Sequence, residues 1–300
     1  MISKKQYKYF TPNQKIVFYS KKNKTYQETK NLTQRLYKQT IRRPSTLLIN
    51  IIQPLLWLIM FGALFQNAPI YLFEKYNLEY REFLSAGIII FTAFNSSINA
   101  GITIVFDREF GFLNRILISP INNKSSLVYS SIIHTWIITI SQITGIVLIT
   151  CYQNQTNTNY IHNISNLNNI LTTTFITTMI IISISNLSIC NGFILPGHIE
   201  FIGLTTFFLN LPTLFTSTAL APLSFMPNWL QIITCMNPLT YAIEIIRNLH
   251  LNQLFQLNGI IINTEWLQAN GSQGIIVLLF TNVFSFILVK NIIKYKYDKT

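Results

Sequence analysis

Six long apolar runs, separated by shorter polar stretches, constrain this chain more than any other feature of its sequence. A membrane-crossing helix needs roughly 20 mostly apolar residues, and each run is about that long. Away from their ends the runs contain no Asp, Glu, Lys or Arg, as the bilayer interior requires. The sequence therefore predicts an all-α, polytopic membrane protein with six transmembrane helices, at residues 45–65, 83–105, 127–151, 171–195, 201–220 and 274–293.

The basic residues are divided unevenly between the two sides that six crossings create. Of the 22 Lys and Arg residues, all but Lys75, Arg81 and Arg247 precede the first run, follow the second, or lie at or beyond the end of the last. By the positive-inside rule we expect both termini on the cytoplasmic or stromal side. The net charge of +12 is thereby explained as a topology signal, and nucleic acid is not expected as a partner.

Polarity also divides the chain into segments. The first 44 residues are polar and basic, with no apolar stretch of the kind found in secretory signal peptides. The predicted division is a basic, disordered N-terminus over 1–25, an interfacial amphipathic helix over 26–44, a transmembrane domain over 45–293 and a basic C-terminal tail over 294–300.

The segment before the first run is predicted to be an amphipathic helix. Arg35, Lys38 and Arg42 recur at spacings of three and four and share one helical face. Leu32 and Leu36 lie on another face. Such a helix can rest in the membrane interface, although a solvated, charged lead-in to the first run would satisfy the charge rule equally well.

A different pattern precedes the last run. Residues 229–236 and 239–249 are apolar but too short to cross a membrane, and the Asn-Pro pair between them breaks the helix. This predicts a re-entrant hairpin, which is tolerated where its backbone packs against protein; a helix lying on the outer surface is the alternative. The residues assigned to this segment are Asn237, Pro238, Tyr241 and Arg247.

The second run carries a polar stripe that spans about 100° of a helical wheel. Uncharged polar side chains either join helices through hydrogen bonds or line a path. The two interpretations agree if a path runs between helices of two subunits. Apart from thiols and phenols, the ionisable group at depth is His134, so an ion-coupled carrier, which needs buried ionisable groups, is disfavoured. The possible path residues are Thr92, Asn95, Ser96, Asn99 and Thr103.

The sequence lacks the motifs of common catalytic and metal sites. It contains no GxxxxGK[ST] phosphate loop, no HExxH and no GxSxG. Its three cysteines have neither the spacing of a zinc site nor the even number of a disulfide framework. We therefore expect that the chain is not an enzyme and has no catalytic, cofactor-binding or metal-binding residues.

Three segments resemble ABC-2 type permeases. RRPSTL at 42–47, followed by IQPLLWLIMFG at 52–62, resembles the start of the family's first span. DREFGFLNRILISPI at 107–121 resembles its loop after the second span, and NPLTYAIEIIR at 237–247 its segment before the last. The resemblance covers roughly residues 26–293. Because Ile, Asn, Lys, Tyr and Phe, which have A/T-rich codons, are abundant, the chain is most similar to the plastid-encoded permeases of red algae; a bacterial inner membrane is the alternative location.

The resemblance implies the membrane half of an ATP-driven transporter, commonly an exporter. Two permease chains would pair within membrane lipid, and a separately encoded ABC ATPase, which binds the ATP, would dock on each inner face. The alternatives are an ion-coupled secondary transporter and a non-transporting membrane assembly protein. The substrate class is not implied.

The resemblance also gives a role to the loop after the second run, which holds four charged residues in nine positions of a chain that is 11% charged. In the family this loop forms a short coupling helix pressed against the ATPase, whereas by its composition alone it could be a solvated connection. Charged and apolar side chains would make the contact, Gly111 would permit a tight turn and Pro120 would end the helix. The coupling residues implied within 107–120 are Asp107, Arg108, Glu109, Phe110, Gly111, Leu113, Arg115 and Pro120.

Overall fold

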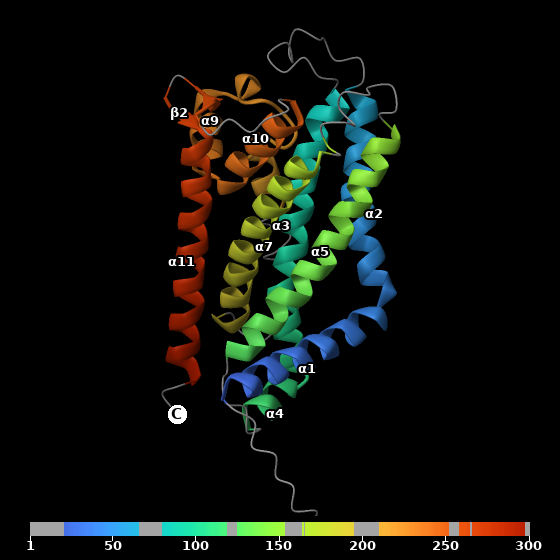
Figure 1. Ribbon diagram of the computed structural model, residues 1–300, viewed down its shortest axis with the longest axis vertical. Helices are drawn as coiled ribbons and strands as arrows, with labels where there is room; N and C mark the ends of the chain where they lie inside the picture. Colours follow the sequence, from blue (N-terminus) through green and yellow to red (C-terminus); the bar gives the residue numbers. More distant parts are fainter. Residues whose placement is uncertain are drawn as a thin grey trace, which may run out of the picture.

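The computed structural model describes residues 21–65, 80–118, 125–153, 164, 166–194, 210–251, 258–264 and 266–297. These residues are mostly helical, and Figure 1 shows the long helices running side by side as a bundle. The helices are α1 (Lys21–Ile41), α2 (Pro44–Leu64), α3 (Tyr80–Glu109), α4 (Phe112–Ile118), α5 (Ser125–Gln153), α7 (Leu167–Ile194), α9 (Asn228–Met236), α10 (Pro238–Leu251) and α11 (Gly271–Tyr297), and a 3-10 turn spans Leu223–Phe225.

Four of the helices are long and apolar enough to cross a membrane. Their apolar stretches are Glu82–Glu109, Ser125–Tyr152, Leu167–Ile194 and Gly271–Lys294, which coincide with the second, third, fourth and last predicted runs. The first predicted run lies in α2, whose apolar stretch, Leu48–Leu64, is shorter. Residues 201–209 of the run predicted at 201–220 lie outside the described residues, and residues 210–215 are helical. The chain is thus an all-α membrane protein in its main architecture.

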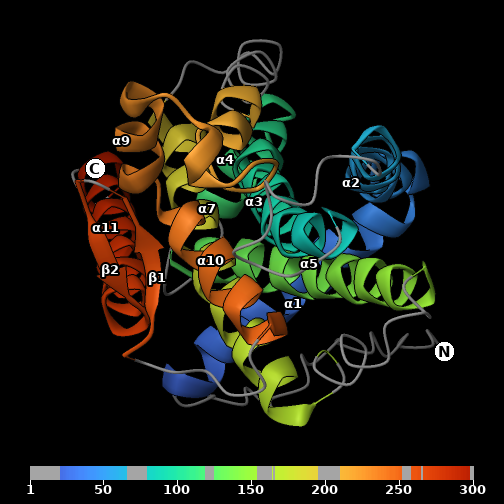
Figure 2. The ribbon, with the colours of Figure 1, turned by 90° about the horizontal axis from the view of Figure 1, so that it is seen from above.

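The central helix of the bundle is α3. Figure 2, seen along the bundle, shows α3 beside α7, with α5 and α10 close by. In α3, 83% of the apolar stretch is buried inside the protein, against 17% in α11. The polar stripe predicted for the second run therefore belongs to the helix with the most protein neighbours, whereas α11 presents most of its apolar side chains to the surroundings.

Small residues let α3 and α7 approach closely. A Cβ atom placed on Gly101 would lie 2.2 Å from the carbonyl oxygen of Ser188, and one on Gly192 would lie 2.9 Å from the carbonyl oxygen of Gly101. The Ser188 hydroxyl accepts a hydrogen bond of 3.1 Å from the Gly101 N–H and donates to the Ile98 carbonyl. Close backbone contact and interhelical hydrogen bonds are what hold helices together in lipid.

One end of the bundle carries α1, α4 and the end of α11, and α1 runs across this end at a steep angle to the long helices (Figure 1). The helix begins at Lys21, before the expected boundary at 26, and ends ahead of Pro44, which opens α2. Its leucine face meets protein: Leu36 is 2% exposed, and Leu32 packs against a buried cluster of α3, α4, α5, α7 and α11 side chains.

The opposite end carries α9, α10 and a short β-hairpin (Figure 1). The break predicted at the Asn-Pro pair separates α9 from α10, and every side chain from 239 to 247 is buried. α9, in contrast, exposes Trp229 and Met236. The hairpin pairs β1 (Ile260–Asn263) antiparallel with β2 (Gln268–Asn270); it is a small departure from an all-helical chain that the sequence did not predict.

Candidate functional site

The junction between α3 and α4 is a tight turn. The N–H of Phe110 donates to the Phe106 carbonyl over 3.0 Å, and the N–H of Gly111 donates to the Arg108 carbonyl over 3.1 Å. Gly111 has φ of +69°, a left-handed conformation that glycine adopts without a steric penalty. The turn ends the long helix and starts α4 as a separate short helix, as the predicted role of Gly111 requires.

The two faces of α4 have different surroundings. Leu113 and Ile116 are 2% and 7% exposed and belong to the buried cluster that α3, α5, α7 and α11 share. On the other face Arg115 is exposed and Ile118 is 86% exposed, and Phe110, just before the helix, is 69% exposed. Leu113 therefore anchors α4 to the bundle, and Phe110 and Ile118 are apolar side chains that point outward.

Asp107 joins α3 to α1. It is 8% exposed and forms an ion pair with Arg35, in which one of the two hydrogen bonds measures 2.9 Å. The Arg35 guanidinium also lies 4.0 Å from the ring centroid of Phe112 in α4, within the range of a cation–π contact. Arg35 thus contacts both α3 and α4, a role that its place on the predicted amphipathic helix did not reveal.

The other predicted coupling residues are placed less fully. Glu109 is exposed and Arg108 is half-buried, and each interacts with another group of the protein. Pro120 lies outside the described residues. The structure thus brings Asp107, Leu113 and Arg115 to one end of the bundle but points only the last of these three outward.

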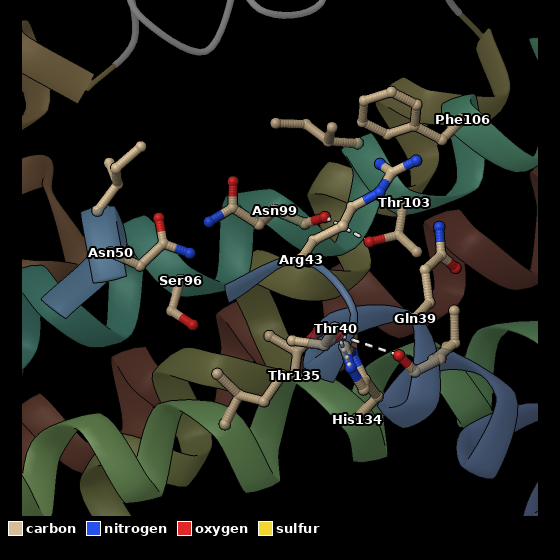
Figure 3. A pocket seen from close by; sticks show the side chains of 14 residues that line it. Gln39, Thr40, Arg43, Asn50, Ser96, Asn99, Thr103, Phe106, His134 and Thr135 are labelled. Carbon is tan, nitrogen blue, oxygen red and sulfur yellow. Dashed lines mark hydrogen bonds between the residues drawn. The ribbon is translucent and has the colours of Figure 1, made fainter. Parts of the chain in front are cut away.

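A cavity of about 250 Å³ lies between α1, α2, α3 and α5, and Figure 3 shows the side chains around it. Three members of the polar stripe, Ser96, Asn99 and Thr103, line the cavity. The facing polar side chains come from α1, α2, α5 and the junction between α1 and α2, and no local sequence pattern connects them with the stripe. They are Gln39, Thr40, Arg43, Asn50, His134 and Thr135.

The remaining two members of the stripe are engaged between and within helices. Asn95 accepts a hydrogen bond of 3.0 Å from the Asn210 side chain and donates one of 3.3 Å to Gln53 in α2. Thr92 is 1% exposed and donates to the Ile88 carbonyl of its own helix over 2.7 Å. Ser96 combines both interpretations, since it lines the cavity and accepts a hydrogen bond of 2.7 Å from the Thr139 hydroxyl of α5. Asn95 thus joins helices, whereas Asn99 and Thr103 face the cavity.

His134 fixes one wall of the cavity. Its Nε2 atom lies 2.8 Å from the Thr40 hydroxyl, which links α5 to α1. Across the cavity, the Arg43 guanidinium lies 5.5 Å from the ring centroid of Phe106 (Figure 3). Thr40 of α1 thus contacts α5, and Arg43, between α1 and α2, contacts α3. Because Leu36, Gln39 and Thr40 line the cavity, α1 forms one of its walls rather than a detached lead-in.

At the opposite end, Asn237 shapes the break before α10. Its side-chain oxygen accepts a hydrogen bond of 3.0 Å from the Leu239 N–H, which caps the helix, and Pro238 is the first helical residue. Its side-chain nitrogen donates to the Thr216 carbonyl over 2.9 Å. Tyr241 is 7% exposed and belongs to the main apolar core.

Arg247 is 1% exposed and forms an ion pair with Glu244, one helical turn away. It also donates a hydrogen bond of 2.8 Å to the Thr218 carbonyl, and its guanidinium lies 3.5 Å from the ring centroid of Phe83 in α3. Arg247 was among the residues expected in this segment and Glu244 was not, although their spacing of three residues within an apolar run was a signal for a buried pair.

Known protein sequences are similar to this chain over most of its length. A sequence model described as "ABC-2 type transporter" matches residues 27–251. The chain is 42% identical over 268 residues to a protein of Porphyra purpurea named "Putative transport permease ycf38", and the match covers 89% of either chain. Proteins of the same name from Cyanophora paradoxa and Pyropia yezoensis are 42% and 43% identical, with 89% and 90% of either chain covered.

Proposed function

Because the chain belongs to the ABC-2 type transporter family, we propose that it is the membrane permease subunit of an exporter driven by a separately encoded ATPase. ATP is bound by that partner, and this chain holds no cofactor of its own. Its apolar helices make it a multi-pass membrane protein. The similarity to algal permeases and the A/T-rich residue bias support a plastid membrane as its location.

The observation that carries the proposal is the two-faced helix α4. Its inward residues, Leu113 and Ile116, are fixed in the bundle, while Arg115 and Ile118 project outward with Phe110. An ATPase seated on the outward face would move α4 and, through the Arg35 contacts with Asp107 and Phe112, would also move α1 and α3. Both of those helices line the cavity, so motion at α4 would reach its walls.

The proposed orientation follows from the ends of the bundle. α1, α4 and the end of α11 lie together (Figure 1), and most basic residues belong to these regions, which supports a cytoplasmic or stromal position for this end. In this orientation the chain crosses six times, α1 lies in the inner interface, and α9 with α10 re-enters from the far side. Two copies of the chain would form the transporter.

We expect a reporter fused after Thr300 to be active only on the inner side.

In a variant without the three native cysteines, single cysteines at the exposed positions Asn228 and Asn258 should both react with an impermeant thiol reagent from the outer side, because the segment between them returns without crossing. Labelling of the two positions from opposite sides would mean an additional crossing and would exclude the re-entrant hairpin.

Docking is tested on the outward face of α4. Changing Arg115→Glu together with Ile118→Asp should abolish copurification of the ATPase in mild detergent and stop transport. Charge reversal at a buried contact costs about 2–5 kcal/mol, and about 1.4 kcal/mol is tenfold in affinity, so docking should weaken more than tenfold. Membrane level and topology should remain normal, because both side chains are exposed at the end of the bundle.

The matched control is Asn291→Asp with Lys294→Glu, which changes net charge by the same amount on exposed residues of α11 at the same end. The control should retain both the ATPase and transport. If the α4 variant behaved like the control, coupling through α4 would be rejected. Transport driven by an ion gradient without ATP would favour the secondary carrier, and a stable membrane complex without an ATPase would favour the assembly protein.

A further inference from the structure

A basic groove of about 520 Å³ runs along α1. Lys38, Arg42 and Arg43 line it and are exposed. Neither Lys38 nor Arg42 forms an ion pair with an acidic group in the part of the chain that the structure describes. The groove therefore presents two uncompensated cations and a third basic side chain to whatever lies beside α1, and the chemistry that matches it is anionic.

The groove continues into the cavity between the helices. Gln39 and Arg43 line both spaces, so the cationic groove is the outer part of a site whose inner part is the cavity. Beyond its polar wall the cavity has an apolar one, formed by Leu36, Ile49, Ile102, Phe106 and Ile138. A single ligand that occupied both parts would need an anionic end and an apolar body.

The cavity also opens towards the apolar outside of the bundle. Ile49 lines it and is 60% exposed, and Ile52, one turn further along α2, is 48% exposed. On α5, the exposed Ile133 and Ile137 flank the lining residues His134 and Ile138. The volume of about 250 Å³ is below the roughly 300–1,000 Å³ of sites that enclose a whole drug-sized ligand. The cavity thus suits one part of a ligand whose remainder stays outside.

We propose that the groove and cavity together form the binding site for an anionic lipid of the inner leaflet, with its headgroup on Lys38, Arg42 and Arg43 and part of an acyl chain in the cavity. This assignment rests on the proposed function, since it names the class of molecule that enters the path at Ser96, Asn99 and Thr103. A soluble anion would use the groove and leave the apolar wall without a role.

The test is a titration of the purified full-length chain, in mild non-ionic detergent, with fluorescent phosphatidylglycerol followed by anisotropy. Each basic residue near an anionic lipid surface contributes an amount equivalent to about a fivefold change in affinity. Lys38→Gln with Arg42→Gln should therefore bind about 25-fold more weakly. The matched control, Lys290→Gln with Lys294→Gln, removes two exposed charges of α11 at the same end and should bind like the unaltered chain.

Three further binding experiments test the groove and the cavity separately. Phosphatidylcholine should bind much more weakly than phosphatidylglycerol, and Thr103→Phe, which fills the cavity, should weaken phosphatidylglycerol binding while the protein remains monodisperse. Glycerol 1-phosphate, the headgroup without chains, should compete poorly. Equal binding of both lipids, an unaffected Thr103→Phe variant or strong competition by the bare headgroup would each overturn the lipid assignment.

The titration contains neither ATPase nor ATP, so its result is independent of docking at α4. Failure of the unaltered chain to bind phosphatidylglycerol, with normal ATPase copurification, would refute the lipid site alone. Retained docking in the Arg115→Glu, Ile118→Asp variant, with the expected lipid binding, would refute the coupling proposal alone.

Discussion

Replacement of Arg247 by Leu is expected to destabilise the protein more than any other single change considered for this chain. The substitution would leave Glu244, which is 2% exposed, without its cation, and breaking a buried ion pair by removing one partner costs about 3–5 kcal/mol. The cation–π contact with Phe83 and the hydrogen bond to Thr218 would be lost with it. Because these contacts join α10 to α3 and to the segment before α9, we expect poor membrane yield and early thermal aggregation in detergent.

Removing Glu244 as well tests whether its unpaired buried charge causes the destabilisation. In the double variant Glu244→Met, Arg247→Leu no buried charge remains, and replacing a buried pair by apolar side chains is often neutral or stabilising. The double variant should therefore be markedly more stable than Arg247→Leu alone. Exposed Arg115 provides the control, because surface substitutions usually change stability by no more than about 0.5 kcal/mol. If Arg247→Leu and Arg115→Leu had the same melting temperature, the buried pair would not hold α10 in place.

The second large effect is expected from a single methyl group on α3. Gly101→Ala would place a Cβ atom 2.2 Å from the backbone oxygen of Ser188, and this oxygen cannot move unless α7 moves with it. Overpacking of a well-packed interior typically costs about 1–3 kcal/mol. Here it would also disturb the hydrogen bond between Ser188 and the Gly101 N–H. We expect a lower melting temperature of the purified protein and partial loss from the membrane.

Alanine at two other glycines gives a series in which the severity of the steric clash decreases. Gly192→Ala brings its Cβ atom to 2.9 Å from the Gly101 oxygen, whereas a Cβ atom on Gly145 in α5 has nothing within 4 Å. Alanine is about 1 kcal/mol more favourable than glycine inside a helix, so Gly145→Ala should be neutral or stabilising. The expected order of melting temperatures is Gly145→Ala highest, Gly192→Ala intermediate and Gly101→Ala lowest. If all three alanine variants had higher melting temperatures than the unaltered protein, as helix propensity alone would predict, then α3 and α7 could separate without a loss of stability.

Much of the fold could be predicted because lipid restricts the choices. An apolar run of about 20 residues must satisfy its own backbone hydrogen bonds, and a helix does this without partners. The second, third, fourth and last runs are accordingly helical over the expected residues. The break at Asn237 and Pro238 and the turn at Gly111 were also predictable, since both depend on the local backbone chemistry of proline and glycine.

The candidate site was predictable only in part, because a helical wheel gives the face of a residue but not its neighbour. The sequence placed the stripe on one face of α3, yet Asn95 joins Gln53 and Asn210 while Asn99 lines the cavity. Leu113 and Arg115 were both expected to contact an ATPase, although they lie on opposite faces of α4. No local pattern distinguishes a helix face that packs inward from one that faces outward when both contain apolar residues.

The sequence by itself determined which segments of this protein are apolar helices, where they break and which end carries the basic residues, because these properties depend on short windows of chain and on the energetics of lipid and water. Only the tertiary structure decided that Arg35 pairs with Asp107, 72 residues away, that Arg247 is a buried residue held against Phe83, and that α1 closes a cavity with α2, α3 and α5. Those contacts join segments far apart in the chain, and they exist only once close packing, such as that of Gly101 against Ser188, has fixed how the helices lie.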